Sequence, residues 1–188
     1  MRVHDINGNR RPRRSRRRLS GKRRVLYDLP RMSVNAADPN MQAAIREALY
    51  GISRGHGGPF GTVIVKDGRI VGRGHNKVLV NNDPTAHGEI SAIRNACGRL
   101  DTKDLSGCEL YTTGEPCPMC LYACLWANID RVYYGCTIDD NSAIGFRDAH
   151  FDQLGGGREA LDDYLVQIDR EACLELFRIY SETEHDLY

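Results

Sequence analysis

The stretch Cys108–Thr137, "CELYTTGEPCPMCLYACLWANIDRVYYGCT", contains two apolar runs separated by a helical pattern. The first run, Cys108–Thr113, is typical of a buried strand, and the second, Arg131–Thr137, is rich in strand-forming residues. Between them, Cys117–Ala127 has the length and composition of a helix. A strand, a helix and a strand in this order predict two parallel strands, which indicates a layered α/β domain.

Upstream of this unit the sequence predicts a helix and a hairpin. Asp38 suits the N-cap and Pro39 the first position of a helix that ends near Gly55. Its apolar residues recur at spacings of three and four, as expected of an amphipathic helix: Met41, Ile45, Ala48, Leu49 and Ile52. The run "GGPFGTVIVKDGRIVGRGHNKVLV" then gives two strands around Asp67-Gly68, a strong hairpin-turn signal.

Further elements complete the alternation of strands and helices. Asp83-Pro84-Thr85 is expected to start a second helix that ends near Gly98. Its inward-facing residues are expected to be Ile90, Ile93, and Ala96 or Cys97. Near the end of the chain, "DYLVQID" (residues 163–169) is a candidate fifth strand. Residues 170–185 are a candidate last helix.

Length and composition bound the architecture. A chain of 188 residues with 41% hydrophobic content suits one domain with a two- or three-layer core. No apolar run approaches the roughly 18 to 20 residues that span a bilayer, and the first residues lack the apolar region of a secretory signal. Seven cysteines, an odd number, fit a reducing compartment. We therefore expect a soluble, cytoplasmic protein.

The first 31 residues differ from the rest in charge. They hold 12 of the 26 Lys and Arg and 2 of the 25 Asp and Glu, a net charge of +10, which leaves −9 for the remainder against a total of +1. We expect residues 1–31 to be a disordered basic extension and residues 32–188 to be the functional domain. The extension could be a nucleic-acid arm, a targeting segment or a stretch without function. If it has no function, translation could begin at Met32.

Three residues have the chemistry of a metal site. Cys117 and Cys120 are three apart at the start of a predicted helix, so both sulfurs face one point. The positive end of the helix dipole favours the thiolate form that binds metal. His87 starts another predicted helix that could face the same point. One imidazole and two thiolates suit tetrahedral zinc with a fourth position for water.

Glu89 separates a catalytic zinc from a structural one. A carboxylate two residues from a ligand can take a proton from zinc-bound water and pass it to a substrate. An H-x-E followed by P-C-x-x-C is typical of zinc deaminases, in which the Glu is the general acid and base. The alternatives are no metal, or a structural zinc completed by Cys97, Cys108 or Cys124. Otherwise we expect these three cysteines, with Cys136 and Cys173, to be small buried hydrophobes.

The blocks "GGPFGTVIVKDG", "HNKVLVNNDPTAHGEISAIRNAC", "ELYTTGEPCPMC" and "IGFRDAHF" together resemble the guanine deaminase branch of the cytidine deaminase-like superfamily. The resemblance covers about residues 38–150 and includes the order and spacing of the blocks. It implies a three-layer α/β/α fold with a mixed five-stranded sheet, and one catalytic Zn²⁺ per subunit. It also implies a homodimer, with a C-terminal segment that crosses to the partner subunit in some relatives.

The resemblance also implies roles for single residues. His87, Cys117 and Cys120 would be the zinc ligands and Glu89 the proton shuttle. The remaining roles concern the substrate: Phe60 would stack on the purine, Asn76 would hydrogen-bond the base, Asp148 would bind the guanine edge and help move a proton, and the terminal Tyr188 would close the pocket. Each of these residues could instead have no functional role. Phe60 would then be a core aromatic, Asn76 a turn residue, Asp148 a solvated loop acid and Tyr188 part of a frayed chain end.

Three positions depart from the pattern of guanine deaminases. Gly114 stands where Cys is common, Gly88 replaces Ala, and Arg147 replaces an acid beside Asp148. The predicted reaction is hydrolysis of guanine to xanthine and ammonia. Alternatives are a nucleoside (guanosine or cytidine) or cytosine deaminase, a transfer-RNA adenosine deaminase, and a zinc-stabilised nucleic-acid-binding module. Nucleic acid is an unexpected partner for the acidic body unless the basic extension binds it. The other histidines are expected on the surface or in loops: His56, His75, His150 and His185.

Overall fold

The structure is a computed structural model that describes residues 34–147 and 165–183. Its helices are α1 (Pro39–Ser53), α2 (Val78–Asn81), α3 (Gly88–Leu100), α4 (Pro118–Trp126), α5 (Ile138–Ala143) and α7 (Arg170–Ser181). Its strands are β1 (Gly61–Lys66), β2 (Arg69–His75), β3 (Cys108–Gly114), β4 (Arg131–Cys136) and β5 (Leu165–Gln167). The expected basic extension, residues 1–31, and Met32 lie outside the described residues.

The strands form one sheet in the order β2-β1-β3-β4-β5. β1 pairs antiparallel with both β2 and β3, whereas β3–β4 and β4–β5 are parallel. The expected mixed five-stranded sheet is therefore confirmed, with parallel pairing in its later half. The hairpin turn falls where predicted, because Asp67 and Gly68 both adopt positive φ (49° and 70°), as a tight two-residue turn requires.

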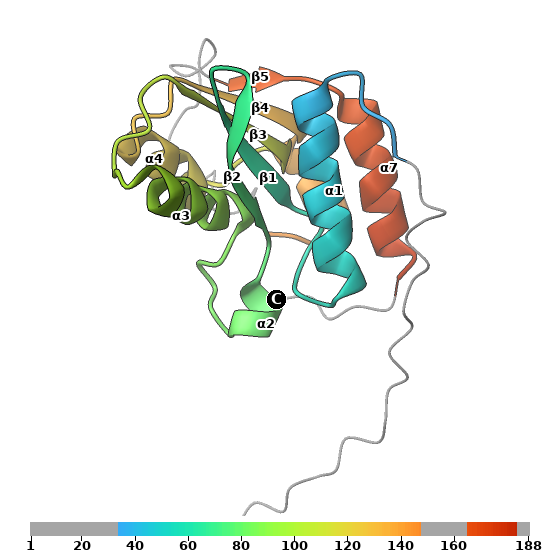
Figure 1. Cartoon of the computed structure of the whole chain (residues 1–188). Helices are drawn as coiled ribbons and strands as arrows, with labels where there is room; N and C mark the ends of the chain where they lie inside the picture. The colour runs from blue at the N-terminus through green and yellow to red at the C-terminus, as the bar shows by residue number, and fades with distance from the viewer. Residues whose placement is uncertain (1–33, 148–164, 184–188) are drawn as a thin grey trace, which may run out of the picture.

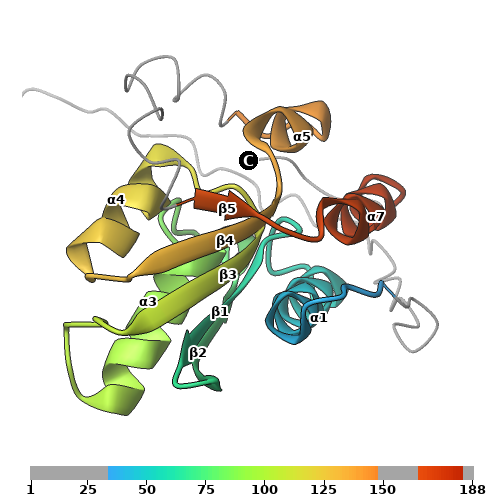
Figure 2. The same cartoon turned by 90° about the horizontal axis from the view of Figure 1, so that it is seen from above.

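Helices cover both faces of the sheet, so the fold has three layers (Figures 1 and 2). α1 and α7 pack on one face around a core that includes Met41, Ile45 and Phe177. α3 and α4 pack on the other face around a core that includes Ile64, Leu105 and Leu110. The three-layer α/β/α prediction is confirmed.

The start of α1 follows the sequence. Asp38 is the N-cap, and its Oδ1 accepts hydrogen bonds from the backbone N–H groups of Asn40 (2.7 Å) and Met41 (2.8 Å). These bonds satisfy amides that the first helical turn leaves without a partner. The predicted apolar stripe faces the sheet: Met41, Ile45 and Ala48 are buried, and Leu49 and Ile52 pack against the same core.

The predicted start of the second helix is wrong, whereas its predicted end near Gly98 is close to the observed end at Leu100. Asp83 caps a turn instead, because its Oδ1 accepts from both the backbone N–H (2.8 Å) and the hydroxyl (2.7 Å) of Thr85. Helix α3 begins at Gly88, with His87 as its N-cap. It continues past Gly98 to Leu100, and Asp101 ends it in the left-handed conformation (φ 51°).

The residues that α3 turns inward differ in part from those expected. Ala92 and Ala96 are buried against the sheet, and Ile93 and Cys97 are partly buried beside them. Ile90, which was expected to face inward, is only half-buried. Two short helices, α2 and α5, had no clear signal in the sequence. Among the described residues, no helix is long and apolar enough to cross a bilayer.

Candidate zinc site and its surroundings

The starts of two helices bring the predicted metal ligands together. His87 precedes α3 and Cys117 precedes α4, and both have the extended backbone of an N-cap residue. Cys120 lies in the first turn of α4 and is fully buried. His87 Nδ1 lies 3.7 Å from Cys117 Sγ and 3.5 Å from Cys120 Sγ. The donor atoms of all three residues lie within 4.8 Å of one another.

These distances fit a tetrahedral zinc ion. Zinc binds imidazole nitrogen at about 2.0 to 2.1 Å and thiolate sulfur at about 2.3 Å, so tetrahedral angles put the nitrogen and sulfur about 3.5 to 3.6 Å apart. Within the described residues no fourth His, Cys, Asp or Glu joins the cluster. Three protein ligands are typical of a catalytic zinc, whereas a structural zinc normally has four. The alternative with Cys97, Cys108 or Cys124 as a fourth ligand therefore has no support in the described chain.

Electrostatics at the cluster favour a thiolate. A hydrogen bond from the Cys120 side chain, together with the nearby His87 ring, lowers the pKa of Cys117 to about 4. The same thiol–thiolate hydrogen bond and burial raise the pKa of Cys120. The N-termini of α3 and α4 add partial positive charge at the same point. These helix N-termini stabilise negative charge on the two sulfurs, and also on any substrate atom beside them that becomes negative during a reaction.

Glu89 lies in the first turn of α3, two residues after His87, and is only 5% exposed. Burial raises the pKa of its carboxyl group to about 7, although the nearby His87 ring acts in the opposite direction. A carboxyl group with a pKa near neutrality can both accept and donate a proton at physiological pH. The structure thus places this carboxyl group within the first turn of the helix that His87 caps.

The loop that leads into Cys117 is held by contacts that the sequence did not predict. The backbone N–H of Glu115 donates to the carbonyl of Cys136 at the end of β4 (2.7 Å). The Glu115 side chain accepts a hydrogen bond from the backbone N–H of Ile138 at the start of α5 (2.8 Å). α5 therefore positions the cysteine loop. Its capping box at Thr137 and Asp140 is the signal that could have identified this helix.

The predicted base-binding residues fall into two groups. Phe60 is half-buried, and its ring meets Phe146 and Phe177 edge to face, with centroids 4.8 and 5.7 Å apart. Asn76 is 1% exposed, and its Oδ1 accepts from the backbone N–H of Val78 (3.1 Å). The other two predicted residues, Asp148 and Tyr188, lie outside the described residues.

Two of the unusual glycines have packing reasons. A Cβ at Gly114 would lie 2.9 Å from both Phe60 Cε1 and Asn141 Oδ1. A Cβ at Gly88 would lie 2.9 Å from Thr62 Oγ1 and 3.0 Å from the Phe60 carbonyl oxygen. In this chain the absence of side chains at both positions therefore makes room for Phe60.

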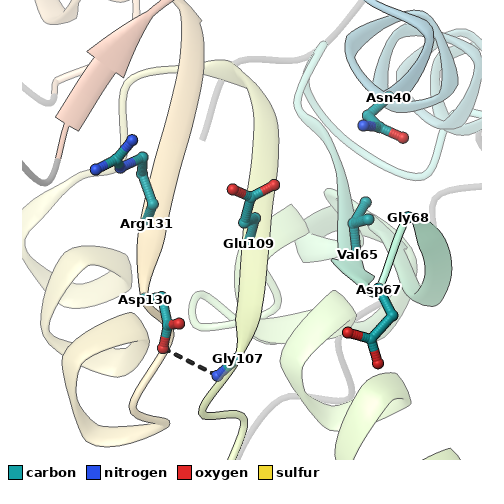
Figure 3. A pocket seen from close by; sticks show the side chains of 8 residues that line it. All are labelled: Asn40, Val65, Asp67, Gly68, Gly107, Glu109, Asp130 and Arg131. Carbon is teal, nitrogen blue, oxygen red and sulfur yellow. Dashed lines mark hydrogen bonds between the residues drawn. The ribbon is translucent and has the colours of Figure 1, made fainter.

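A hollow of about 440 Å³ lies at the end of the sheet where β3 and β4 start (Figure 3). Its lining includes Asp67 of the hairpin turn, Glu109 in β3, and Asp130 and Arg131 at the start of β4. The Asp130 side chain there accepts from the backbone N–H of Gly107 (3.0 Å). The hollow lies at the start of β3, whereas the cysteine loop follows its end. It is not the candidate site.

Comparison with known proteins agrees with this geometry. The cytidine and deoxycytidylate deaminase zinc-binding region matches residues 35–136. The guanine deaminase of Bacillus subtilis is 49% identical over 109 residues, which cover 58% of this chain and 70% of the relative. A tRNA-specific adenosine deaminase of Aquifex aeolicus is 48% identical over 94 residues, 50% of this chain and 62% of the relative.

Solved structures lead to the same family. A structure of guanine deaminase from Nitrosomonas europaea superposes with a TM-score of 0.68 at 29% identity, and the match covers 78% of this chain and 86% of that one. The resemblance inferred from the sequence motifs is confirmed, and so is the expected zinc cofactor. The chain belongs to the family of deaminases that share the cytidine and deoxycytidylate deaminase zinc-binding region.

Proposed function

We propose that this protein is a zinc-dependent hydrolase that converts guanine to xanthine and ammonia, a reaction of purine metabolism. The observation that carries the proposal is the cluster of one imidazole and two sulfurs beside the buried carboxyl group of Glu89. The likeness to guanine deaminases in both sequence and structure supports the choice of substrate.

In this proposal His87, Cys117 and Cys120 hold zinc and Glu89 moves protons. A bound zinc ion supplies Lewis acidity, which lowers the pKa of a coordinated water from about 15.7 towards 7. Glu89 accepts the proton of the attacking water and passes it to a ring nitrogen while C2 of guanine becomes tetrahedral. It then takes the proton of the new C2 hydroxyl group and delivers it to the amino group, which leaves as ammonia while the C2 carbonyl forms. The N-terminus of α4 stabilises negative charge that develops beside it.

The purine would be held by residues of two neighbouring segments. Phe60 would stack on the ring, and Asn76 would donate from its amide nitrogen, because its amide oxygen already accepts from the Val78 backbone. Asp148 and Tyr188 stay predicted contacts to the guanine edge and over the pocket. Arg147 is related to these contacts only as the sequence neighbour of Asp148.

A substrate panel tests this proposal. Zinc-loaded protein is incubated with guanine, guanosine, adenine, cytosine and cytidine while ammonia release is measured. We expect release from guanine at a higher kcat/KM than from any other compound. Preferred turnover of cytidine or cytosine would replace guanine with that substrate. Ammonia from none of the five would contradict the proposal.

A transfer-RNA adenosine deaminase is the second candidate, favoured by the 48% identity to the Aquifex aeolicus enzyme. The net charge of −9 after residue 31 argues against it, since RNA binding needs positive charge along the phosphates. The basic extension, with 12 of the 26 Lys and Arg, could supply that charge. Inosine formation in transfer RNA that is lost on deletion of residues 1–31 would favour this second candidate over guanine.

We also propose that the protein is a cytoplasmic homodimer. Seven free cysteines suit a reducing compartment. α4 exposes a row of large apolar side chains, with Trp126 86% and Tyr122 60% exposed and Met119 and Leu125 more than a third exposed. Such a patch is typical of a protein interface. The predicted exchange of C-terminal segments concerns residues outside the described chain.

A further inference from the structure

Two histidines expected on the surface or in loops form a stacked pair, which corrects that expectation for His75. His75 ends β2 and is only 6% exposed, whereas His56 is half-buried in the loop between α1 and β1. Their rings are nearly parallel, at 20°, with centroids 5.2 Å apart. His56 Nδ1 lies 2.9 Å from His75 Nε2. On its other side, His75 Nδ1 lies 3.5 Å from Glu47 Oε2 in α1.

The chemistry of these groups fixes where the ring protons lie. An ionised carboxylate can only accept, so His75 Nδ1 carries a hydrogen that points to Glu47. In a neutral His75 ring Nε2 is then an acceptor, and His56 Nδ1 is the donor to it. The hydrogen bond from His75 lowers the pKa of Glu47, and burial lowers the pKa of His56. Both shifts favour an ionised Glu47 and a neutral His56 at neutral pH.

The surroundings of the pair are built to hold it. The Tyr50 ring meets both imidazoles edge to face, with centroids 6.1 and 5.4 Å away. Arg73 lies 3.5 Å from the other oxygen of Glu47. Gly51 leaves space for the His75 ring, since a Cβ there would lie 2.7 Å from His75 Cδ2.

The pair joins the two segments that carry the proposed purine contacts. The carbonyl of His56 accepts from the backbone N–H groups of Leu79 (3.1 Å) and Val80 (3.3 Å), at the start of α2. Farther along the same loop, the carbonyl of Phe60 accepts from the backbone N–H of Asn76 (2.8 Å). His56 and His75 thus form a side-chain link between the loop that leads to Phe60 and the strand end that leads to Asn76.

We propose that His56 and His75 are positioning residues for purine binding, whose ring hydrogen bond acts together with the backbone bond from Asn76 to Phe60 to hold these two residues in place. The inference rests on the proposed function. The pair is separate from Glu89 and the metal ligands, which belong to α3 and α4. Its loss is therefore expected to weaken binding of the base more than the chemical step.

Two substitutions at His56 separate hydrogen bonding from packing. His56→Asn keeps an N–H donor close to the position of Nδ1, whereas His56→Leu keeps bulk without a donor. For guanine we expect His56→Leu to raise KM about 3- to 10-fold, the range for one lost hydrogen bond, with kcat within about 2-fold. His56→Asn is expected to retain most of the wild-type KM. Tyr50→Leu removes packing beside the rings but no donor, and it is expected to raise KM less than His56→Leu does.

Zinc content and thermal unfolding of each variant verify that it is folded. Wild-type KM in both His56 variants, or an equal rise in both, would overturn the positioning role while the guanine deaminase proposal stood. Failure of wild-type protein to release ammonia from guanine would instead sink the proposed function.

Nuclear magnetic resonance tests the hydrogen-bonded chain without any substrate. A long-range ¹H–¹⁵N correlation spectrum of protein with ¹⁵N-labelled histidine reports which ring nitrogen carries the proton. We expect His56 and His75 both to be protonated at Nδ1 at pH 7.5, with assignments made from the His56→Asn and His75→Gln variants. A proton at Nε2 of His75 would overturn the inference even if a variant used for kinetics failed to fold.

Discussion

Glu89 is the residue whose role is most directly testable. Its carboxyl group is buried beside the ligand cluster, and Gln has nearly the same shape without the ability to shuttle a proton. We expect Glu89→Gln to keep zinc and fold but to lower kcat by a factor of about 10² to 10⁴, the range for general acid–base catalysis. Metal analysis, circular dichroism and ammonia release measure the three quantities. A variant with wild-type turnover would contradict the assigned role.

The residues that the sequence predicted best are those whose chemistry requires a fixed spacing. His87, Cys117 and Cys120 were identified because three donors of these types at helix starts suit one ion, and the structure brings them together. His75 was missed because a single histidine before an asparagine carries no sequence signal for burial. Its environment depends on Glu47 and His56, which come from other segments.

At the scale of elements, the position of α3 depends on its close approach to β2. A Cβ at Gly74 in β2 would lie 2.4 Å from both the Ala92 nitrogen and the Gly88 carbonyl oxygen. Because backbone atoms cannot move aside cheaply, we expect Gly74→Ala to lower the free energy of unfolding by about 3 kcal/mol. Urea denaturation measures this change.

A glycine on the outer side of the same helix provides the matched control. Gly98 is exposed, and a Cβ there would meet nothing within 4 Å. Gly98→Ala should raise the free energy of unfolding by up to about 1 kcal/mol, because alanine favours the helix. Equal effects of the two substitutions would show that packing against β2 does not determine where α3 lies.

The ion pair between α5 and α7 predicts a pH-dependent contribution to stability. Burial alone would raise the pKa of Asp140, but hydrogen bonds from Arg170 and Thr137 outweigh it, and the pKa is lowered. A carboxyl group whose pKa is lowered by folding stabilises the fold at pH values above its unfolded-state pKa of 3.8. This stabilisation is lost as the pH falls through the pKa of the folded state. We expect Asp140→Asn to cost about 1 to 2 kcal/mol at pH 7 and much less near pH 2.

Urea denaturation at the two pH values measures this difference. Glu171→Gln is the control, because Glu171 also contacts Arg170, at 3.3 Å, but its side chain is 84% exposed. Exposed ion pairs contribute about 0 to 1 kcal/mol, so the control should change stability little at either pH. A penalty for Asp140→Asn that did not depend on pH would assign its effect to packing or capping instead.

The elements that sequence analysis predicted are those with a long periodic pattern. The α1 stripe, the hairpin and the strand–helix–strand unit all occur as expected. The predicted start of α3 was wrong because Asp83 and Thr85 bond to each other in a turn, and this turn uses the same residue types as a helix cap. Short α2 depends on contacts with another segment, at His56, that no local pattern predicts. α5 also contacts another segment, at Glu115, but its capping box at Thr137 and Asp140 is a local signal that could have identified it.

For the whole molecule, the arrangement of helices explains where the chemistry lies. The cysteine loop follows the end of β3, where α3 and α4 begin side by side on one face of the sheet (Figure 2). Both helix starts can therefore point at one ion. The helices on the opposite face, α1 and α7, complete the second core (Figure 1). The candidate site thus lies at one end of the sheet and takes its side chains from the starts of two helices.

The exposed apolar face of α4 gives the prediction for the assembly. Trp126 is 86% exposed and Tyr122 is 60% exposed, and a dimer that covers them would gain apolar burial of roughly 25 cal/mol per Å². We expect the double variant Tyr122→Ser, Trp126→Ser to shift the protein from dimer to monomer in sedimentation-velocity experiments at micromolar concentration. Tyr50→Ser, which changes a 45% exposed aromatic on α1, is the control and should stay dimeric. A wild-type protein that sediments as a monomer would contradict the dimer, whereas a dimeric double variant would move the interface away from α4.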